Sequence, residues 1–381
     1  MRFRDFRLER YFAEWEFSAK ILLGSSDPEA MRLPELLALA DDDGRRRWEE
    51  LWLGYTESAG LPALREAVAG QFSGCDLADV LVFSAPEEAI FHVAAAVLEP
   101  GDHMVGITPA YQSSYEIPRS VGAQVTLVPL REDRGWALDT DEVAAALTAR
   151  TKLIYINFPH NPTGAMLSAT AQRRVVELAD SCGAHLFSDE VYRGLELDPA
   201  DRLPAAADLH PRAISLGGLS KAYGLPGVRL GWTVCRDADL NRRMQAAKDF
   251  TTICASAPSE VLALIAVRAA DRLIGRALDG ITRNLGLVDE FMRRRPDAVR
   301  WVRPRGGSIG FPELLIDLPV AAFCERLVRE HGVLLIPGRM FEIGTNHFRI
   351  GLGRASLPTG LAVLGNFMDQ LDGEAGTGAV P

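Results

Sequence analysis

Between residues 80 and 235, short apolar runs alternate with longer segments whose apolar residues recur at helical spacing. The apolar runs cover residues 80–83, 103–108, 124–130, 152–158, 184–190, 213–218 and 230–235. Strands separated by helices pair most readily as parallel neighbours, because the helix carries the chain back to the start of the sheet. The alternation therefore predicts an α/β fold with a mostly parallel sheet.

The chain has 381 residues, which is more than a single hydrophobic core of roughly 250–300 residues holds. After about residue 260 the pattern changes to one long helical segment, over 259–295, followed by several short strand candidates. We predict a large domain over residues 49–270 and a small α+β domain over residues 271–381. The N-terminal segment, residues 1–48, is expected to join the small domain.

The composition excludes several classes of protein. Acidic residues outnumber basic ones by 51 to 41, which gives a net charge of −10 and disfavours nucleic acid or an anionic membrane as partner. Neither a run of 18 apolar residues nor an apolar N-terminal stretch is present, so we expect no membrane span, no signal peptide and a cytoplasmic location. The five cysteines are scattered without a CxxC pair, which predicts neither disulfides nor a metal site.

Polar clusters follow three of the predicted strands. They are NFPHNPTG at 157–164, DEVY at 189–192 and LSKAYGLPGVRLGW at 219–232. The carboxyl ends of parallel strands meet at one edge of the sheet, where open α/β sheets bind their ligands. The third cluster contains Lys221, one of only four lysines, flanked by small and apolar residues that would lower its pKa. Lys221 is therefore a candidate catalytic amine.

These motifs, together with FRIGLG at 348–353, resemble the class I and II aminotransferases, which are pyridoxal 5′-phosphate (PLP) enzymes of fold type I. The resemblance extends from about Tyr55 to Arg354. It implies PLP as cofactor, an amino acid as substrate, and a large domain with a mostly parallel sheet beside a small α+β domain. It also implies a homodimer with shared active sites.

The resemblance assigns roles to individual residues. Lys221 would hold the cofactor aldehyde as a Schiff base and then move the proton at the substrate α-carbon. Asp189 would keep the pyridine nitrogen protonated, and Arg349 would bind the substrate α-carboxylate through paired donors. The other implied contacts are Asn161 and Tyr192 at the cofactor phenolate, Asn161 also beside the substrate, Tyr111 on the ring, Ser220 and Arg229 at the phosphate, and Tyr55 at the phosphate of the neighbouring subunit.

Two stretches depart from the family pattern. The usual phosphate loop offers free backbone N–H groups, whereas this chain reads FSAPEEAIF at 83–91. Pro86 has no N–H, and Glu87 places a carboxylate near a phosphate dianion. We expect some backbone donors to remain, such as those of Ala85 or Glu87. The other departure is Gly218, which stands where many members of the family have a second hydroxyl side chain.

A narrower resemblance links the chain to the capreomycidine synthases, which have the same fold type but cyclise a hydroxylated arginine. The stretches that carry it are residues 8–12, 157–165, 219–232 and 324–339. A guanidinium side chain would need carboxylates in its pocket. Glu16 is our candidate, and Glu9, Glu14 and Asp27 in the same segment are others.

Amino-group transfer from an α-amino acid to a 2-oxo acid is the first functional hypothesis. The alternative is elimination with intramolecular replacement on a hydroxylated, arginine-like amino acid. Both reactions begin with loss of the α-proton, so the motifs do not separate them. A third class, transcriptional regulators that retain this fold, carries an N-terminal DNA-binding domain. Because the chain is acidic and reaches Tyr55 within about fifty residues, we do not expect that class.

Overall fold

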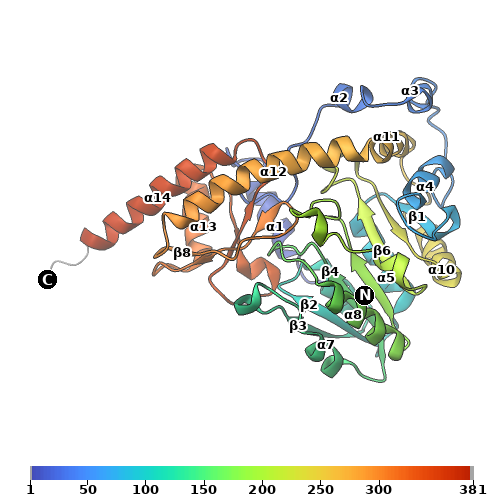
Figure 1. Ribbon diagram of the computed structural model, residues 1–381, viewed down its shortest axis with the longest axis horizontal. Coiled ribbons are helices and arrows are strands. Elements are labelled where there is room, and N and C mark those ends of the chain that lie inside the picture. The colour runs from blue at the N-terminus through green and yellow to red at the C-terminus, as the bar shows by residue number, and fades with distance from the viewer. Residues whose placement is uncertain (1, 378–381) are drawn as a thin grey trace.

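A computed structural model describes residues 2–377, and its centre is a seven-stranded sheet (Figure 1). The strands are β1 (Val80–Phe83), β2 (His103–Thr108), β3 (Gln124–Pro129), β4 (Thr151–Asn157), β5 (His185–Asp189), β6 (Ala213–Gly218) and β7 (Gly231–Val234). Their order is β1-β7-β6-β5-β4-β2-β3, and only β7 runs antiparallel to its neighbours. The predicted α/β fold with a mostly parallel sheet is confirmed.

Helices cover both faces of this sheet. They are α4 (Pro62–Ala69), α5 (Pro86–Val97), α6 (Ser113–Ser120), α7 (Thr140–Ala146), α8 (Ala169–Ser181), α9 (Ala206–Leu209), α10 (Ala238–Lys248) and α11 (Ala257–Arg268). Alternate residues of β4 show the two faces: Leu153 belongs to the hydrophobic cluster of α5 and α10, whereas Ile154 belongs to that of α8. Because both faces are buried, the central strands are apolar along most of their length.

The C-terminal part of the chain forms two small sheets. One pairs β8 (Val299–Arg300) with β10 (Glu313–Leu314), and the other contains β9 (Ile309–Gly310), β11 (Ile336–Pro337) and β12 (Phe348–Gly351). Two helices complete this part, α13 (Val320–His331) and α14 (Leu357–Thr377). Together these elements form an α+β arrangement beside the large sheet.

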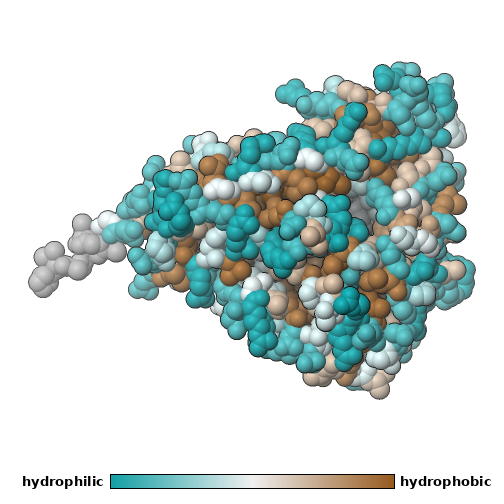
Figure 2. Space-filling view, in the orientation of Figure 1, coloured by the Kyte–Doolittle hydropathy of each residue, from teal (hydrophilic) through white to brown (hydrophobic). Residues whose placement is uncertain are grey.

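A long helix, α12 (Ala270–Arg293), crosses the molecule from the large sheet to the C-terminal part (Figure 1). The sequence predicted one unbroken helix here, but α11 ends at Arg268 and a new helix begins two residues later. On the face shown in Figure 2, hydrophobic residues gather along α12 and hydrophilic residues surround them. The helix therefore contributes to the surface as well as to the core.

The N-terminal segment contains α1 (Arg7–Trp15), α2 (Leu33–Leu37) and α3 (Asp42–Glu49). Its residues around 21–24 join the C-terminal part, because the Gly24 N–H donates to the Leu334 carbonyl (2.7 Å) and the Gly351 N–H to the Leu23 carbonyl (2.7 Å). Helices α2 and α3 of the same segment instead contact α11, and Arg268 pairs with Asp41 and Asp43. The division at 48/49 and 270/271 stays a prediction. Residues 378–381 of the third predicted domain lie outside the described residues.

Two observations concern the predicted environment of the protein. Within residues 2–377, no helix combines the length and the apolar character needed to cross a membrane. All five cysteines are free thiols, as the sequence predicted. The cytoplasmic location stays a prediction.

Candidate active site

The carboxyl ends of β4, β5 and β6 bring three predicted residues together. Asn161 follows β4, Asp189 is the last residue of β5, and Lys221 follows β6. Because these strands are parallel neighbours, the segments after them emerge at the same edge of the sheet. The strand order therefore brings the three motifs together at one edge of the sheet, as the sequence predicted.

Lys221 occupies the centre of the site. Its Nζ donates to the Ser26 hydroxyl at 2.8 Å. Burial is the main cause that lowers the pKa of Lys221 to about 8; Asp27 opposes this shift, and Arg349 adds to it. An amine with this pKa is partly unprotonated near neutral pH and can act as a nucleophile or a base. The sequence had indicated no role for Ser26.

Asp189 is a buried carboxylate with oriented donors. The Tyr155 hydroxyl donates to its Oδ2 at 2.9 Å, and the Val191 N–H donates to its Oδ1 at 3.2 Å. Burial raises the pKa of Asp189 to about 6. Among the described residues no cation forms an ion pair with it, so the carboxylate can pair with a protonated ring nitrogen. Strand alternation was the signal that could have found Tyr155, which lies on the same face of β4 as Asn157.

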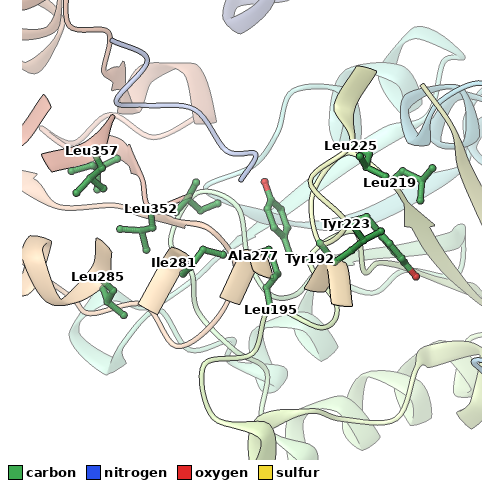
Figure 3. Close-up of a cluster of buried hydrophobic side chains, with 14 of the residues drawn as sticks. Tyr192, Leu195, Leu219, Tyr223, Leu225, Ala277, Ile281, Leu285, Leu352 and Leu357 are labelled. Atoms are coloured by element: carbon green, nitrogen blue, oxygen red, sulfur yellow. The ribbon is translucent and has the colours of Figure 1, made fainter. Parts of the chain in front are cut away.

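Tyr192 has an apolar ring and an unsatisfied hydroxyl. Its ring packs in a hydrophobic cluster with Leu195 and Ala277, and its hydroxyl points out of that cluster (Figure 3). The buried hydroxyl makes no hydrogen bond of normal geometry within residues 2–377, although Ser26 lies close to it. An unpaired buried hydroxyl is costly, so this one is suited to a ligand oxygen.

Arg349 is completely buried on β12. Its Nε donates to the Gly24 carbonyl at 3.0 Å, and its Nη1 donates to Asn161 Oδ1 at 3.1 Å. The guanidinium also lies over the Phe341 ring, 5.2 Å from its centroid. No carboxylate of the described chain pairs with it, and burial lowers its pKa. Because a buried cation without an anion is unfavourable, Arg349 is suited to a carboxylate ligand.

A chain of hydrogen bonds positions the Asn161 loop. The Asn161 N–H donates to Asn157 Oδ1 (3.0 Å), and Asn157 Nδ2 donates to the Asp189 carbonyl (2.9 Å). His160 bonds to the Thr163 hydroxyl (2.7 Å) and to the Pro109 carbonyl (3.0 Å). Burial lowers the pKa of His160 to about 3, so this histidine is a neutral structural link. The loop is thereby fixed relative to the segment that carries Tyr111.

Helix α1 contributes to the site through Tyr111. The Tyr111 hydroxyl donates to Glu9 Oε1 at 3.2 Å, and its ring lies 5.1 Å from the Phe6 ring. Burial raises the pKa of Tyr111 well above its ordinary value. The carboxylate of Glu9 is therefore held beside Tyr111, the residue predicted to lie on the cofactor ring.

Glu9 is one of three carboxylates on this side of the site. Burial raises the pKa of Glu16, and the charges of Glu9 and Asp27 raise it further, while Lys221 opposes them. Asp27 accepts a hydrogen bond from Arg354 at 2.6 Å. Glu9 and Asp27 thus both act electrostatically on Glu16, as does Lys221, and we call these three carboxylates the carboxylate cluster.

Glu14, another candidate from the sequence, has a different partner. It lies 3.6 Å from Arg329 and is exposed on α1. The structure therefore groups three of the four candidate carboxylates and leaves Glu14 out.

The predicted phosphate residues include Arg229, which acts electrostatically on Lys221. Arg229 Nη1 donates to the Ser220 hydroxyl at 3.4 Å and to the Pro226 carbonyl at 3.1 Å. Ala85 caps α5, and Glu87 lies in the first turn of that helix. Arg229 interacts electrostatically with Glu87, so the two segments face the same space. A phosphate there would meet a cation, a hydroxyl and a helix N-terminus.

The two departures from the family pattern depend on each other. A Cβ atom at Gly218 would lie 2.5 Å from Pro86 Cγ, and one at Gly231 would lie 2.7 Å from the Pro86 nitrogen. Pro86 therefore packs directly on the backbone of β6 and β7. A hydroxyl side chain at position 218 does not fit while proline occupies position 86.

Tyr55 lies outside the site of its own chain. Its side chain is 84% exposed, and the neighbouring Trp52 and Leu53 are 78% and 79% exposed. Three adjacent large apolar side chains in water are unusual on a monomer. Tyr55 is therefore available to another molecule.

The open groups of the site match the functional groups of PLP and an amino acid. Asp189 suits the ring nitrogen, Tyr192 the ring oxygen, Arg349 the substrate carboxylate, and Lys221 the aldehyde. The fold and this set of side chains define a PLP-dependent enzyme.

The chain belongs to the aminotransferase class I and II family, whose sequence profile matches residues 18–359. It is 35% identical to the capreomycidine synthase of Streptomyces vinaceus, over 94% of this chain and 92% of that one. It is 31% identical to an arginine–pyruvate transaminase of Pseudomonas aeruginosa, over 78% and 77% of the two chains. The solved structure of the PLP-dependent cyclase OrfR superposes with a TM-score of 0.88 at 29% identity, covering 97% of this chain and 98% of that one. The predicted family, fold and cofactor are confirmed.

Proposed function

We propose that this enzyme acts on an α-amino acid with a cationic, arginine-like side chain. We further propose that it removes a hydroxyl group from the β-carbon and closes the side chain onto that carbon. The carboxylate cluster beside Lys221 carries this proposal, because a site with three interacting carboxylates favours a substrate cation. A relative named for arginine–pyruvate transamination supports the same substrate class.

Arg349 and the carboxylate cluster would hold the two ends of such a substrate. Arg349 lacks a carboxylate partner within the described chain and would bind the α-carboxylate. Glu9 would bind the guanidinium, since Asp27 already accepts from Arg354 and the raised pKa of Glu16 favours its protonated form. Binding at both ends would place the α- and β-carbons near Lys221.

When bound, PLP supplies an electron sink that makes the α-proton of the substrate acidic. The Lys221 amine would accept that proton. Glu16, whose pKa is raised, would give a proton to the departing β-hydroxyl, which leaves as water. A side-chain nitrogen then bonds to the β-carbon and returns its proton to Glu16, and Lys221 returns its proton to the α-carbon. The net change is the loss of one water molecule, with no oxidation or reduction.

Amino-group transfer on the same substrate is the second candidate. It uses Lys221, Asp189 and Arg349 in the same way, and the 31% identity to an arginine transaminase favours it. It needs no acid at the β-carbon. Glu16 is therefore the residue that separates the two proposals.

The two reactions differ in their need for an acceptor. The purified enzyme is incubated with arginine, with 3-hydroxyarginine and with norleucine, each with and without pyruvate, and the products are identified by mass spectrometry. We expect sustained turnover of 3-hydroxyarginine without pyruvate, loss of 18 mass units as water, and no amine form of the cofactor. Turnover that requires pyruvate and yields the amine form would contradict the replacement reaction and favour transfer.

Glu16→Gln and Glu14→Gln provide a matched pair on the same segment. We expect Glu16→Gln to reduce turnover of the hydroxylated substrate by about 10²-fold, the scale of a lost general acid. Glu14→Gln should be close to wild type, since Glu14 pairs with Arg329. Equal behaviour of the two variants would contradict the role of Glu16.

We also propose that the enzyme is a homodimer in which Tyr55 reaches the phosphate site of the neighbouring subunit. Its 84% exposure beside Trp52 and Leu53 supports this arrangement. Sedimentation analysis should give twice the mass of 41.6 kDa. Trp52→Glu should shift the protein toward the monomer, and a wild-type monomer at micromolar concentration would contradict the proposal.

A further inference from the structure

We infer that the Glu87 side chain is part of the cofactor-phosphate site and that it carries a proton when the phosphate is bound. The inference concerns binding of PLP and is independent of the reaction proposed above. In this role the Glu87 carboxyl donates a hydrogen bond to the phosphate and replaces donors that this chain lacks.

Few hydrogen-bond donors are available at the N-terminus of α5, where the phosphate would bind. Pro86, the first residue of the helix, has no N–H. The Ser84 N–H is already used, because it donates to Glu88 Oε2 at 2.6 Å. Gly218 contributes no hydroxyl, and Pro86 excludes one there. A phosphate at this place would therefore meet backbone donors such as those of Ala85 and Glu87, but fewer donors in all than the family provides there.

The Glu87 carboxyl faces the same space. The Ser113 hydroxyl donates to its Oε2 at 3.2 Å, and no described residue forms an ion pair with it. The charged groups around it are Glu9 from α1, Asp189 from β5 and Arg229 after β6. The hydroxyls of Tyr111 and Tyr155 also lie near it, and Arg4, Glu88, His92 and Glu116 line the same cavity as Glu87. Glu87 is thus within electrostatic reach of both Asp189 and Arg229.

An ionised Glu87 would repel a phosphate dianion, whereas a protonated Glu87 can donate to it. Even without a phosphate, burial raises the pKa of Glu87 to about 7, with Glu9 and Asp189 contributing and the Ser113 hydrogen bond opposing. A nearby dianion favours the protonated form further. Phosphate binding should therefore be strongest below about pH 7 and weaken as the pH rises through that value.

Two ligands without an aldehyde isolate the phosphate contribution. Pyridoxamine phosphate and pyridoxamine share the ring but differ in the phosphate, and neither forms a Schiff base with Lys221. Their dissociation constants for the apoenzyme are measured between pH 7 and pH 8.5, where the phosphate remains almost entirely a dianion. For the wild type we expect the affinity for pyridoxamine phosphate, divided by that for pyridoxamine, to fall about tenfold between pH 7 and pH 8.5. The reason is that Glu87, which titrates near pH 7, loses its proton over this range.

Variants of one residue complete the test. In Glu87→Gln the ratio should fall less with pH than in the wild type, because the amide donates at every pH and Lys221, whose pKa is about 8, still titrates in this range. Glu87→Asp should keep the full dependence. Glu66→Gln, on the exposed face of α4, is the control and should follow the wild type. A wild-type ratio that does not change with pH would overturn the inference, as would an equal fall in Glu87→Gln.

Calorimetry of the wild type alone provides a second measurement that needs no variant. At pH 8, binding of pyridoxamine phosphate should take up more protons than binding of pyridoxamine, by a fraction of a proton. The uptake is measured by comparing the binding enthalpies in two buffers that differ in ionisation enthalpy. Equal uptake by both ligands would contradict the inference even if Glu87→Gln failed to fold.

Discussion

Lys221→Ala should abolish covalent retention of the cofactor and reduce turnover by about 10⁴-fold, the upper range for a lost proton-transfer group. The reason is that one amine has two tasks: it holds the aldehyde and it moves the α-proton. Its pKa of about 8 allows both near neutral pH. The wild type should be yellow, and borohydride should fix the cofactor to the peptide that contains Lys221. The variant should lack this label.

The other lysines are internal controls for this experiment. Lys248 is fully buried, but its Nζ donates to the carbonyls of Ser58 (2.6 Å) and Ile253 (3.1 Å). Its amine is therefore occupied by hydrogen bonds to backbone carbonyls and should remain unlabelled. Lys20 and Lys152 should also remain unlabelled. Label on any of these three peptides would overturn the assignment of Lys221.

Asp189→Asn should retain cofactor but reduce turnover by about 10²- to 10³-fold, the scale of a lost electrostatic contact in a buried site. The amide preserves the shape and an acceptor for the Val191 N–H, but it loses the charge that keeps the ring nitrogen protonated. Turnover and cofactor content are measured together, so that loss of chemistry is separated from loss of binding. Asp189→Ala should show the same direction with less cofactor bound.

Glu190→Gln is the matched control, since Glu190 is the next residue and is also buried. Its Oε1 accepts from the Ala206 N–H (2.9 Å) and the Ser215 hydroxyl (3.1 Å), away from Tyr155. We expect its turnover to stay within a few-fold of wild type. Near-normal turnover of Asp189→Asn would show that the placement of Asp189 at the ring nitrogen is wrong.

The fold could be predicted because its signals are local. Apolar runs of four to seven residues, separated by helical periodicity, mark all seven strands of the large sheet. The Ala269 break between α11 and α12 was missed, because alanine favours helix and offers no stop signal. Local propensity therefore predicted the elements but not every boundary.

The family, the cofactor and motif residues such as Lys221, Asp189 and Arg349 could be predicted from the sequence, through the resemblance that the motifs carry. Their partners became visible only in the folded chain: Tyr155 on Asp189, Ser26 on Lys221, and Glu9 rather than Glu14 beside the site. Motifs are encoded in contiguous residues, so they can be read along the chain.

The partners of those motif residues come from segments far apart in the sequence, and their positions depend on how the layers pack. Pro86 shows this most directly. From the sequence, Pro86 indicates only that one backbone N–H donor to the phosphate is missing. In the fold it also packs on Gly218 and Gly231 and excludes a side chain there. Only packing connects those three positions, because no local signal relates a helix start to two distant strands.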